Sequence, residues 1–83
     1  MKIRYFAWVR ERVGRAEEDI AIPDNVTNVS ALLDWMKSRG EEYEAAFTHK
    51  GVVRVASDRV HARPDAPLAG AGEIAFFPPM TGG

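Results

Sequence analysis

The stretch EIAFFPPMTGG, residues 73–83, combines a β-strand with an ending that no strand can contain. In an extended chain, Ile74 and Phe76 fall on one face and Ala75 and Phe77 fall on the other, so one face can enter a core. Two prolines follow at once, and because proline has no amide hydrogen to donate, they end the ladder. The pattern therefore predicts a last strand at residues 73–77.

The residues after this strand are poorly suited to completing a core. Gly82 and Gly83 have no side chain to bury, and glycine loses more backbone entropy on folding than any other residue. The terminus is then either slack chain or the working part of the molecule. We expect one folded domain at residues 1–78 and a flexible tail at residues 79–83.

The start of the chain predicts two more strands. Residues 2–9, KIRYFAWV, alternate in the period of a strand. One face carries Ile3, Tyr5 and Ala7, and the other carries Lys2, Arg4, Phe6 and Trp8. Residues 10–14, RERVG, favour a turn or a single helical turn closed by Gly14. Residues 17–23, EEDIAIP, predict a second strand with Glu18, Ile20 and Ile22 on one face, paired with the first as a hairpin.

The middle of the chain carries the clearest helix signal. Apolar residues recur there at i, i+3, i+4 and i+7, namely Val29, Leu32, Leu33 and Met36. Thr27 can cap the start, and Gly40 suits the left-handed position beyond the end. Residues 41–47, EEYEAAF, predict a shorter helical piece with Tyr43 and Phe47 turned inward.

The remaining segment predicts two short strands and a loop. Residues 51–62 form the strands around Ser57-Asp58, and residues 63–72 form the loop. The resulting element order is β-β-α-β-β-β, which describes an α+β protein of the β-grasp, or ubiquitin-like, type. We expect a mixed sheet of about five strands packed on one main helix, with the first and last strands side by side in the centre.

Composition excludes several classes of function. The 83 residues have room for one small domain, and a net charge of -1 gives no field that would favour nucleic acid or an anionic membrane as a partner. Cysteine is absent, so the chain itself makes no disulfide, thiolate nucleophile or cysteine-ligated metal site. No segment resembles a signal peptide or a membrane span, and we therefore expect a cytoplasmic protein.

Two segments carry a family resemblance. FAWVRERVG at residues 6–14 and PLAGAGEIAFFPPMTGG at residues 67–83, with the helix between them, resemble the small, sulfur-carrying subunits of molybdopterin synthase. These are ubiquitin-like proteins that end in Gly-Gly. The most specific part of the resemblance is a hydrophobic strand followed by Phe-Phe-Pro-Pro, a variable residue, Thr and the terminal Gly-Gly.

The resemblance implies a definite chemistry at Gly83. An ATP-using enzyme similar to ubiquitin-activating enzymes joins AMP to the terminal carboxylate, which turns an unreactive anion into a mixed anhydride with a good leaving group. Sulfur from a donor system then replaces AMP and leaves a thiocarboxylate. The chain itself is expected to bind no cofactor, because ATP is consumed by the activating enzyme.

The resemblance also implies where the sulfur goes. The thiocarboxylate enters a pocket on the large synthase subunit, in a heterotetrameric complex, and its sulfur attacks cyclic pyranopterin monophosphate. Two transfers build the dithiolene that later holds molybdenum. The small subunit is then a reloadable co-substrate, and the acid-base residues are expected on the large subunit.

Partner contacts are expected at the tail and at the strand exit. The residues assigned to them are Phe6, Phe77, Pro78, Pro79, Met80, Thr81 and Gly82. The prolines hold the exit extended and so lower the entropy lost on docking, and the glycines fit a narrow channel. If the first and last strands are neighbours, Phe6 and Phe77 share an exposed patch, with Trp8 and Val60 as possible further members. The alternative is that a loop or the second helical piece covers these rings.

Other polar residues carry weaker signals. His49 and His61 have no spaced partners, so surface or half-buried histidines are favoured over a metal site or a catalytic base. The acidic clusters at residues 17–19 and 41–44 favour solvated faces.

Three functions therefore compete. The first is the sulfur carrier for molybdopterin. The second is a related carrier for thiamin, tRNA or cysteine sulfuration, or a ubiquitin-like protein modifier. The third is a β-grasp binding module whose terminus has no chemistry. The Phe-Phe-Pro-Pro exit favours the first over the second, and only the chemistry of Gly83 separates both from the third.

Overall fold

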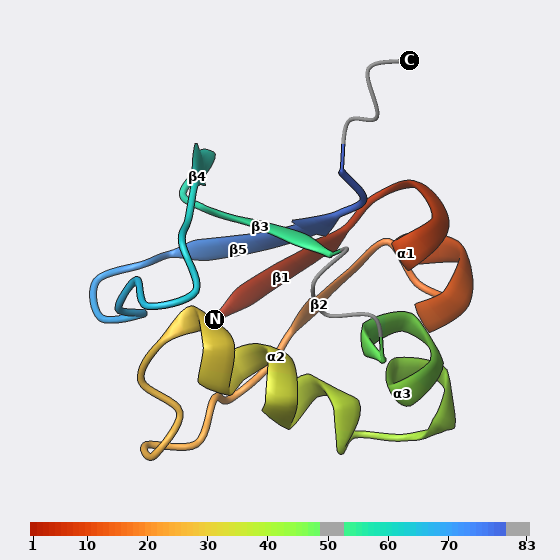
Figure 1. Ribbon diagram of the computed structural model, residues 1–83, viewed down its shortest axis with the longest axis horizontal. Coiled ribbons are helices and arrows are strands. Elements are labelled where there is room, and N and C mark those ends of the chain that lie inside the picture. The colour runs from red at the N-terminus through yellow and green to blue at the C-terminus, as the bar shows by residue number, and fades with distance from the viewer. Residues whose placement is uncertain (49–52, 80–83) are drawn as a thin grey trace.

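In residues 1–48 and 53–79, which this computed structural model describes, five strands form one mixed sheet and three helices pack beside it (Figure 1). The helices are α1 (Ala7–Val13), α2 (Val29–Lys37) and α3 (Glu41–Phe47). The strands are β1 (Lys2–Tyr5), β2 (Glu17–Asp19), β3 (Arg54–Ser57), β4 (Val60–His61) and β5 (Glu73–Phe77). Both α2 and α3 lie on one face of the sheet, and no described helix lies on the other (Figure 1).

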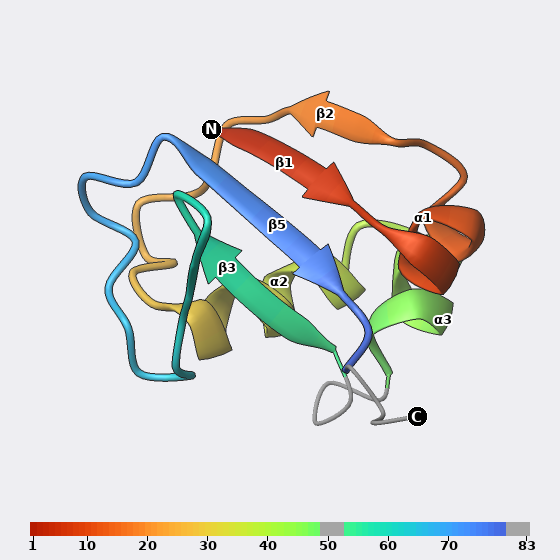
Figure 2. The same cartoon turned by 90° about the horizontal axis from the view of Figure 1, so that it is seen from above.

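The strand order is β2-β1-β5-β3-β4, as the view from above shows for its first four strands (Figure 2). β1 and β5 are parallel, whereas the other neighbouring pairs are antiparallel. The first and last strands thus lie side by side in the centre, as the element order predicts, and the β-grasp prediction is confirmed. Three helices replace the single main helix that was expected, because two short helices accompany α2 within the described residues.

The core forms where β1 and β5 meet the helices. The register pairs Ile3 with Ile74 and Tyr5 with Phe76, and all four side chains are buried. The Phe76 ring stacks on Tyr5 with centroids 6.0 Å apart and meets the Phe47 ring of α3 edge-on at 4.8 Å. Because successive strand residues alternate in direction, the last residue of β5 points to the opposite face of the sheet.

The predicted first strand is too long, because β1 ends at Tyr5 and a helix begins at Ala7. Ala7 has a φ of 53°, a left-handed value that turns the chain out of the strand. Val9 and Val13, four residues apart, are both buried by the helix, and Gly14 ends it at a φ of 89° as expected. β1 and β2 do pair antiparallel, but α1 connects them in place of a hairpin turn, and β2 stops before the isoleucines of the predicted strand.

Helix α2 buries its apolar stripe as predicted, namely Val29, Leu32, Leu33 and Met36. Its cap is Asn28 and not Thr27, because the Asn28 side chain accepts a 2.8 Å hydrogen bond from the Ala31 N–H. Gly40 does not close α2, which ends at Ser38 in a right-handed conformation. It caps α3 instead, with a φ of 157°. Helix α3 turns Tyr43 and Phe47 inward as expected.

The later strands follow the sequence closely. β3 and β4 flank a turn at Asp58 and Arg59, and β5 spans the predicted residues 73–77. No helix among the described residues is long and apolar enough to cross a membrane.

Candidate functional site

The face of the sheet opposite α2 and α3 carries a hollow of about 390 Å³ that runs along β5. Its lining residues are Arg4, Phe6, Ala56, Arg59, Glu73, Ala75 and Phe77. Register places Arg4 beside Ala75 and Ala56 beside Ala75, so the two small alanines lie between larger side chains. Glu73 marks one end of this row on β5, and Phe77 marks the other, next to the exit of the tail.

Two aromatic residues lie at the tail end of the hollow. Phe6 is 41% exposed and Phe77 is partly exposed. They share the hollow because Phe6 directly follows β1, Phe77 ends β5, and these two strands are neighbours. The Phe6 N–H donates to the Phe76 carbonyl at 3.0 Å, which holds the residue beside β5. The expected shared patch is confirmed, and α3 does not cover it since Phe47 packs into the core on the other side of the sheet. Binding by these rings stays a prediction.

Trp8 and Val60, the two possible further members, do not line the hollow. Trp8 lies on α1, where the Arg12 guanidinium carbon sits 5.1 Å from its ring. Val60 is 69% exposed, but it pairs with Ser57, whose own partner Ile74 points into the core. Register therefore places Val60 at the edge strand on the helix side.

Charge in the hollow is arranged around Glu73. Arg4 Nη1 lies 3.5 Å from one Glu73 oxygen, and Arg59 Nε lies 4.0 Å from the other. The Arg4 guanidinium carbon is also 5.3 Å from the centre of the Phe6 ring, within the range of a cation–π contact. Two cations against one carboxylate leave the hollow positive.

The turn between β3 and β4 is held against the start of β5. Asp58 and Arg59 both have left-handed φ values, 48° and 70°. The Asp58 carboxylate accepts hydrogen bonds of 3.0 Å from the N–H groups of Gly72 and Glu73, and the Asp58 N–H donates to the Glu73 carbonyl. These bonds fix the backbone next to Arg59. The Arg59 side chain is 86% exposed at the end of the hollow.

Sequence reasoning missed the position of His61. Its ring meets the Phe77 ring at a centroid distance of 6.3 Å and an interplanar angle of 67°. His61 is exposed, as expected, but it belongs to the aromatic end of this face because it pairs with Ala56 on β3. The sequence signal that could have placed His61 on this face was the strand register across the Asp58-Arg59 turn. His49 lies outside the described residues.

The tail is described only at its start. Pro78 and Pro79 follow β5 directly and are partly buried. The other predicted site residues, Met80, Thr81, Gly82 and Gly83, lie outside the described residues.

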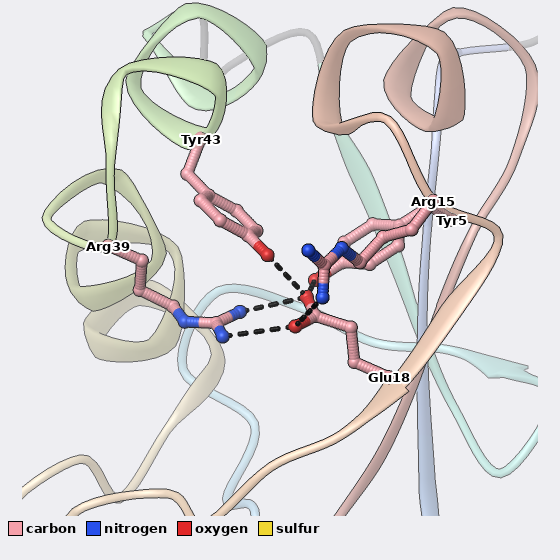
Figure 3. A network of polar contacts seen from close by, with 5 residues as sticks. All are labelled: Tyr5, Arg15, Glu18, Arg39 and Tyr43. Carbon is pink, nitrogen blue, oxygen red and sulfur yellow. Dashed lines mark hydrogen bonds and ion pairs between the residues drawn. The ribbon is translucent and has the colours of Figure 1, made fainter.

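Glu18, a carboxylate whose pKa is strongly lowered, lies on the helix side of the sheet (Figure 3). Arg39 donates two hydrogen bonds to it at 2.9 and 3.1 Å, while Tyr43 and Tyr5 donate at 2.7 and 2.5 Å. Arg15 donates a fifth at 3.2 Å, and only 6% of the Glu18 side chain is exposed. The prediction that residues 17–19 form a solvated face is therefore wrong for Glu18.

These bonds explain the ionisation of the cluster. Burial by itself would raise the pKa of Glu18, but hydrogen bonds from Arg39, Tyr5 and Tyr43 outweigh it and lower the pKa to about 2. Burial and the Glu18 charge raise the pKa of both tyrosines, and the bond to Glu18 raises the pKa of Arg39. Perturbed groups often mark active sites, but Glu18 accepts five bonds and has little capacity left for a substrate. The cluster joins β2 to α3 and acts as a structural clamp.

Metal binding has no visible basis in this part of the chain. Among residues 1–48 and 53–79, no group of three or more His, Asp or Glu side chains is placed to hold a metal ion.

The chain is similar to known proteins along nearly its whole length. The model of the ThiS family matches residues 3–83. A molybdopterin synthase sulfur carrier subunit of Escherichia coli (strain K12) is 34% identical over 83 residues, which is 100% of this chain and 99% of that protein. A protein of the same description from Haemophilus influenzae is 29% identical over the same shares of the two chains.

Solved structures agree on the fold. A putative molybdopterin converting factor, subunit 1, from Pyrococcus furiosus has a TM-score of 0.76 and 26% identity, with 95% of each chain covered. SAMP1 from Haloferax volcanii has a TM-score of 0.72 with 100% of this chain and 98% of that chain covered. At 22% identity, the second likeness concerns the fold alone.

Proposed function

The chain belongs to the ThiS family, and from that membership we propose that it is the sulfur carrier subunit of a molybdopterin synthase. The observation that carries the proposal is the end-to-end similarity to proteins of that description. A carrier of this kind works through its terminus and through a surface that a partner recognises. The chain ends in Gly-Gly four residues after β5, whose last residue, Phe77, lines the first hollow together with Phe6.

The proposed reaction begins with activation of Gly83. In an activating enzyme, a carboxylate oxygen of Gly83 attacks the α-phosphorus of ATP, and pyrophosphate leaves. The acyl adenylate is a mixed anhydride, so a hydrosulfide ion supplied by a donor can attack its carbonyl carbon and expel AMP. The product is a thiocarboxylate, with one carbonyl oxygen kept and one oxygen replaced by sulfur.

The second half of the proposed reaction takes place on the large subunit. The thiocarboxylate sulfur attacks a side-chain carbon of cyclic pyranopterin monophosphate and displaces the oxygen bound to that carbon. Water then adds to the Gly83 carbonyl carbon, the acyl–sulfur bond breaks with the sulfur staying on the precursor, and the Gly83 carboxylate is restored. Repetition with a freshly loaded carrier supplies the second sulfur of the dithiolene. Proton transfers in these steps fall to groups of the large subunit, so this chain acts as a co-substrate.

The described residues support this role by presenting the tail. Phe6 and Phe77 offer apolar surface beside the tail exit, and aromatic side chains, Phe included, are enriched in protein interfaces. Pro78 and Pro79 fix φ near -65° where the chain leaves β5, which reduces the entropy lost when the tail enters a channel. Glycine at the last two positions lets the backbone approach the wall of a narrow channel closely.

Because ATP is consumed by the activating enzyme, we place the reaction in the cytoplasm.

Reconstitution tests the proposal. The protein is incubated with its cognate activating enzyme, ATP and a sulfur donor, and then with the large subunit and cyclic pyranopterin monophosphate. We expect molybdopterin to form in proportion to the thiocarboxylated protein supplied. Loading without conversion would assign the chain to another sulfur pathway, and absence of both adenylate and thiocarboxylate would leave only a binding module.

A further inference from the structure

A second hollow, of about 310 Å³, lies at the β3–β4 edge of the sheet, next to the start of α2. Its apolar walls come from α2, with Val29 and Leu33, and from β3 and the residue before it, with Val55 and Val53. Its rim carries Arg54, His61 and Arg63, and no carboxylate of the described residues lines it. We call this hollow the edge groove.

The edge groove is continuous with the aromatic patch, which Phe6 and Phe77 form at the tail end of the first hollow. Register places Arg54 directly opposite Phe77, and the His61 ring contacts the Phe77 ring. Arg54 and His61 line the edge groove, whereas Phe77 lines the first hollow. A partner that covers Phe77 therefore reaches the rim of the edge groove without crossing intervening structure.

The size of an ordinary interface favours such an extension. The five tail residues 79–83 and the seven residues that line the first hollow make twelve, whereas a specific interface uses roughly 20 to 30 residues a side. On the β2 side of the sheet, the charges already have partners. Lys2 lies 3.6 Å from Glu17, and the N-terminal ammonium lies 3.3 Å from Asp19. Within the described residues Arg54 and Arg63 form no ion pair, so the β3–β4 side has free positive charge.

We propose that the edge groove is a second docking site for the large subunit, filled by a segment that carries an apolar side chain flanked by carboxylates. The identity of the partner rests on the proposed function. The apolar side chain lies against Val29 and Leu33, and the carboxylates meet Arg54 and Arg63. A guanidinium binds a carboxylate through two parallel hydrogen bonds, which fixes orientation as well as affinity. The site sets the rotation of the carrier about its tail, and so the direction in which the tail enters the channel.

Charge reversal at the rim tests this site. Arg63→Glu and Arg54→Glu change exposed side chains, so thermal unfolding should confirm that both variants fold. Calorimetry with the large subunit from the same genome should show about tenfold weaker binding for each variant at low salt, because charged rims steer association and orientation. The difference should shrink at about 0.5 M salt, because salt screens the longer-range attraction between exposed charges.

Lys2→Glu is the matched control, since it makes the same charge change at an exposed position on the β2 side. It should leave the dissociation constant within about twofold of the parent, as expected for a charge outside the contact. An equal loss for Lys2→Glu would show a general effect of net charge and would overturn the proposal.

Two further outcomes would also overturn it. Unchanged binding by Arg63→Glu, when Phe77→Ala is weakened, would limit docking to the aromatic patch. Weaker binding to the activating enzyme alone would assign the edge groove to that protein instead. Failure of the proposed function is seen separately, because the unaltered protein would then form no thiocarboxylate.

Discussion

Replacing Glu18 by Gln should remove a large part of the stability of this domain. The side chain is 6% exposed and accepts hydrogen bonds from two tyrosines and two arginines. Gln keeps the shape, but it has no charge to pair with Arg39, and its amide donors face the donors of Tyr5 and Tyr43. Breaking a buried pair on one side is strongly destabilising because the remaining group loses its compensation.

The magnitude follows from the ionisation of Glu18. Its pKa is about 2 in the folded protein against 4.5 for an ordinary Glu. About 2.5 pKa units at 1.36 kcal/mol each correspond to about 3 kcal/mol of stability from the ionised form. Because the folded pKa is the lower one, this stability is complete above pH 4.5 and is lost as the pH falls from 4.5 towards 2.

Urea unfolding at a series of pH values measures both effects. At neutral pH, Glu18→Gln should lower the free energy of unfolding by about 3 kcal/mol, and the melting temperature by about 12 °C or more for a domain of this size. The variant should also lack the part of the acid-dependent loss of stability below pH 4.5 that Glu18 contributes. Glu17→Gln is the control, because Glu17 is 55% exposed and its 3.6 Å pair with Lys2 contributes at most about 1 kcal/mol. A Glu18→Gln variant within about 0.5 kcal/mol of the parent, or with the same acid profile, would refute the clamp.

Three other predictions address the docking face, the backbone and the terminus. Phe77→Ala or Phe6→Ala should weaken binding to the large subunit by about 1 to 3 kcal/mol in calorimetry and leave the fold intact, whereas unfolding of both would contradict their place outside the core. Ala7→Gly should be neutral or stabilising by up to about 1 kcal/mol in urea unfolding, because a left-handed φ of 53° costs an L-residue but not glycine. Ala45→Gly in the exposed part of α3 is the control and should lower the free energy of unfolding by about 1 kcal/mol. An equal loss for Ala7→Gly and Ala45→Gly would argue against a strained turn at Ala7. One alanine added after Gly83 should change stability by less than about 0.5 kcal/mol yet abolish molybdopterin formation, and normal conversion with the alanine still attached would show that another group reacts.

The elements with unambiguous local signals could be predicted from the sequence. β5 combines strict alternation with Pro78 as a stop, and α2 has a full apolar stripe over two turns. The start of α1 could not be predicted in the same way. Residues 6–9 alternate like a strand, and the helix depends on a left-handed φ at Ala7, a residue type for which no sequence rule favours that conformation. The buried spacing of Val9 and Val13 was the available sign of a helix.

The positions of Phe6 and Phe77 could be predicted from the sequence, but the position of His61 could not. Adjacent central strands bring Phe6 and Phe77 together, and the element order implies that adjacency. His61 depended on the register of β4, which is set by the two left-handed residues of its turn. The Glu18 clamp was out of reach because its partners Arg39 and Tyr43 are 21 and 25 residues away in the sequence.

The mass of the C-terminal peptide shows whether Gly83 carries sulfur. The protein is incubated with the cognate activating enzyme, ATP and a sulfur donor, and its C-terminal peptide is analysed by mass spectrometry beside a sample without ATP. We expect one exchange of oxygen for sulfur, located on Gly83 and dependent on ATP. A control shows that the same activating enzyme loads an established carrier. If that control succeeds and the C-terminal peptide of this chain stays unmodified after incubation with ATP, Gly83 does not carry sulfur.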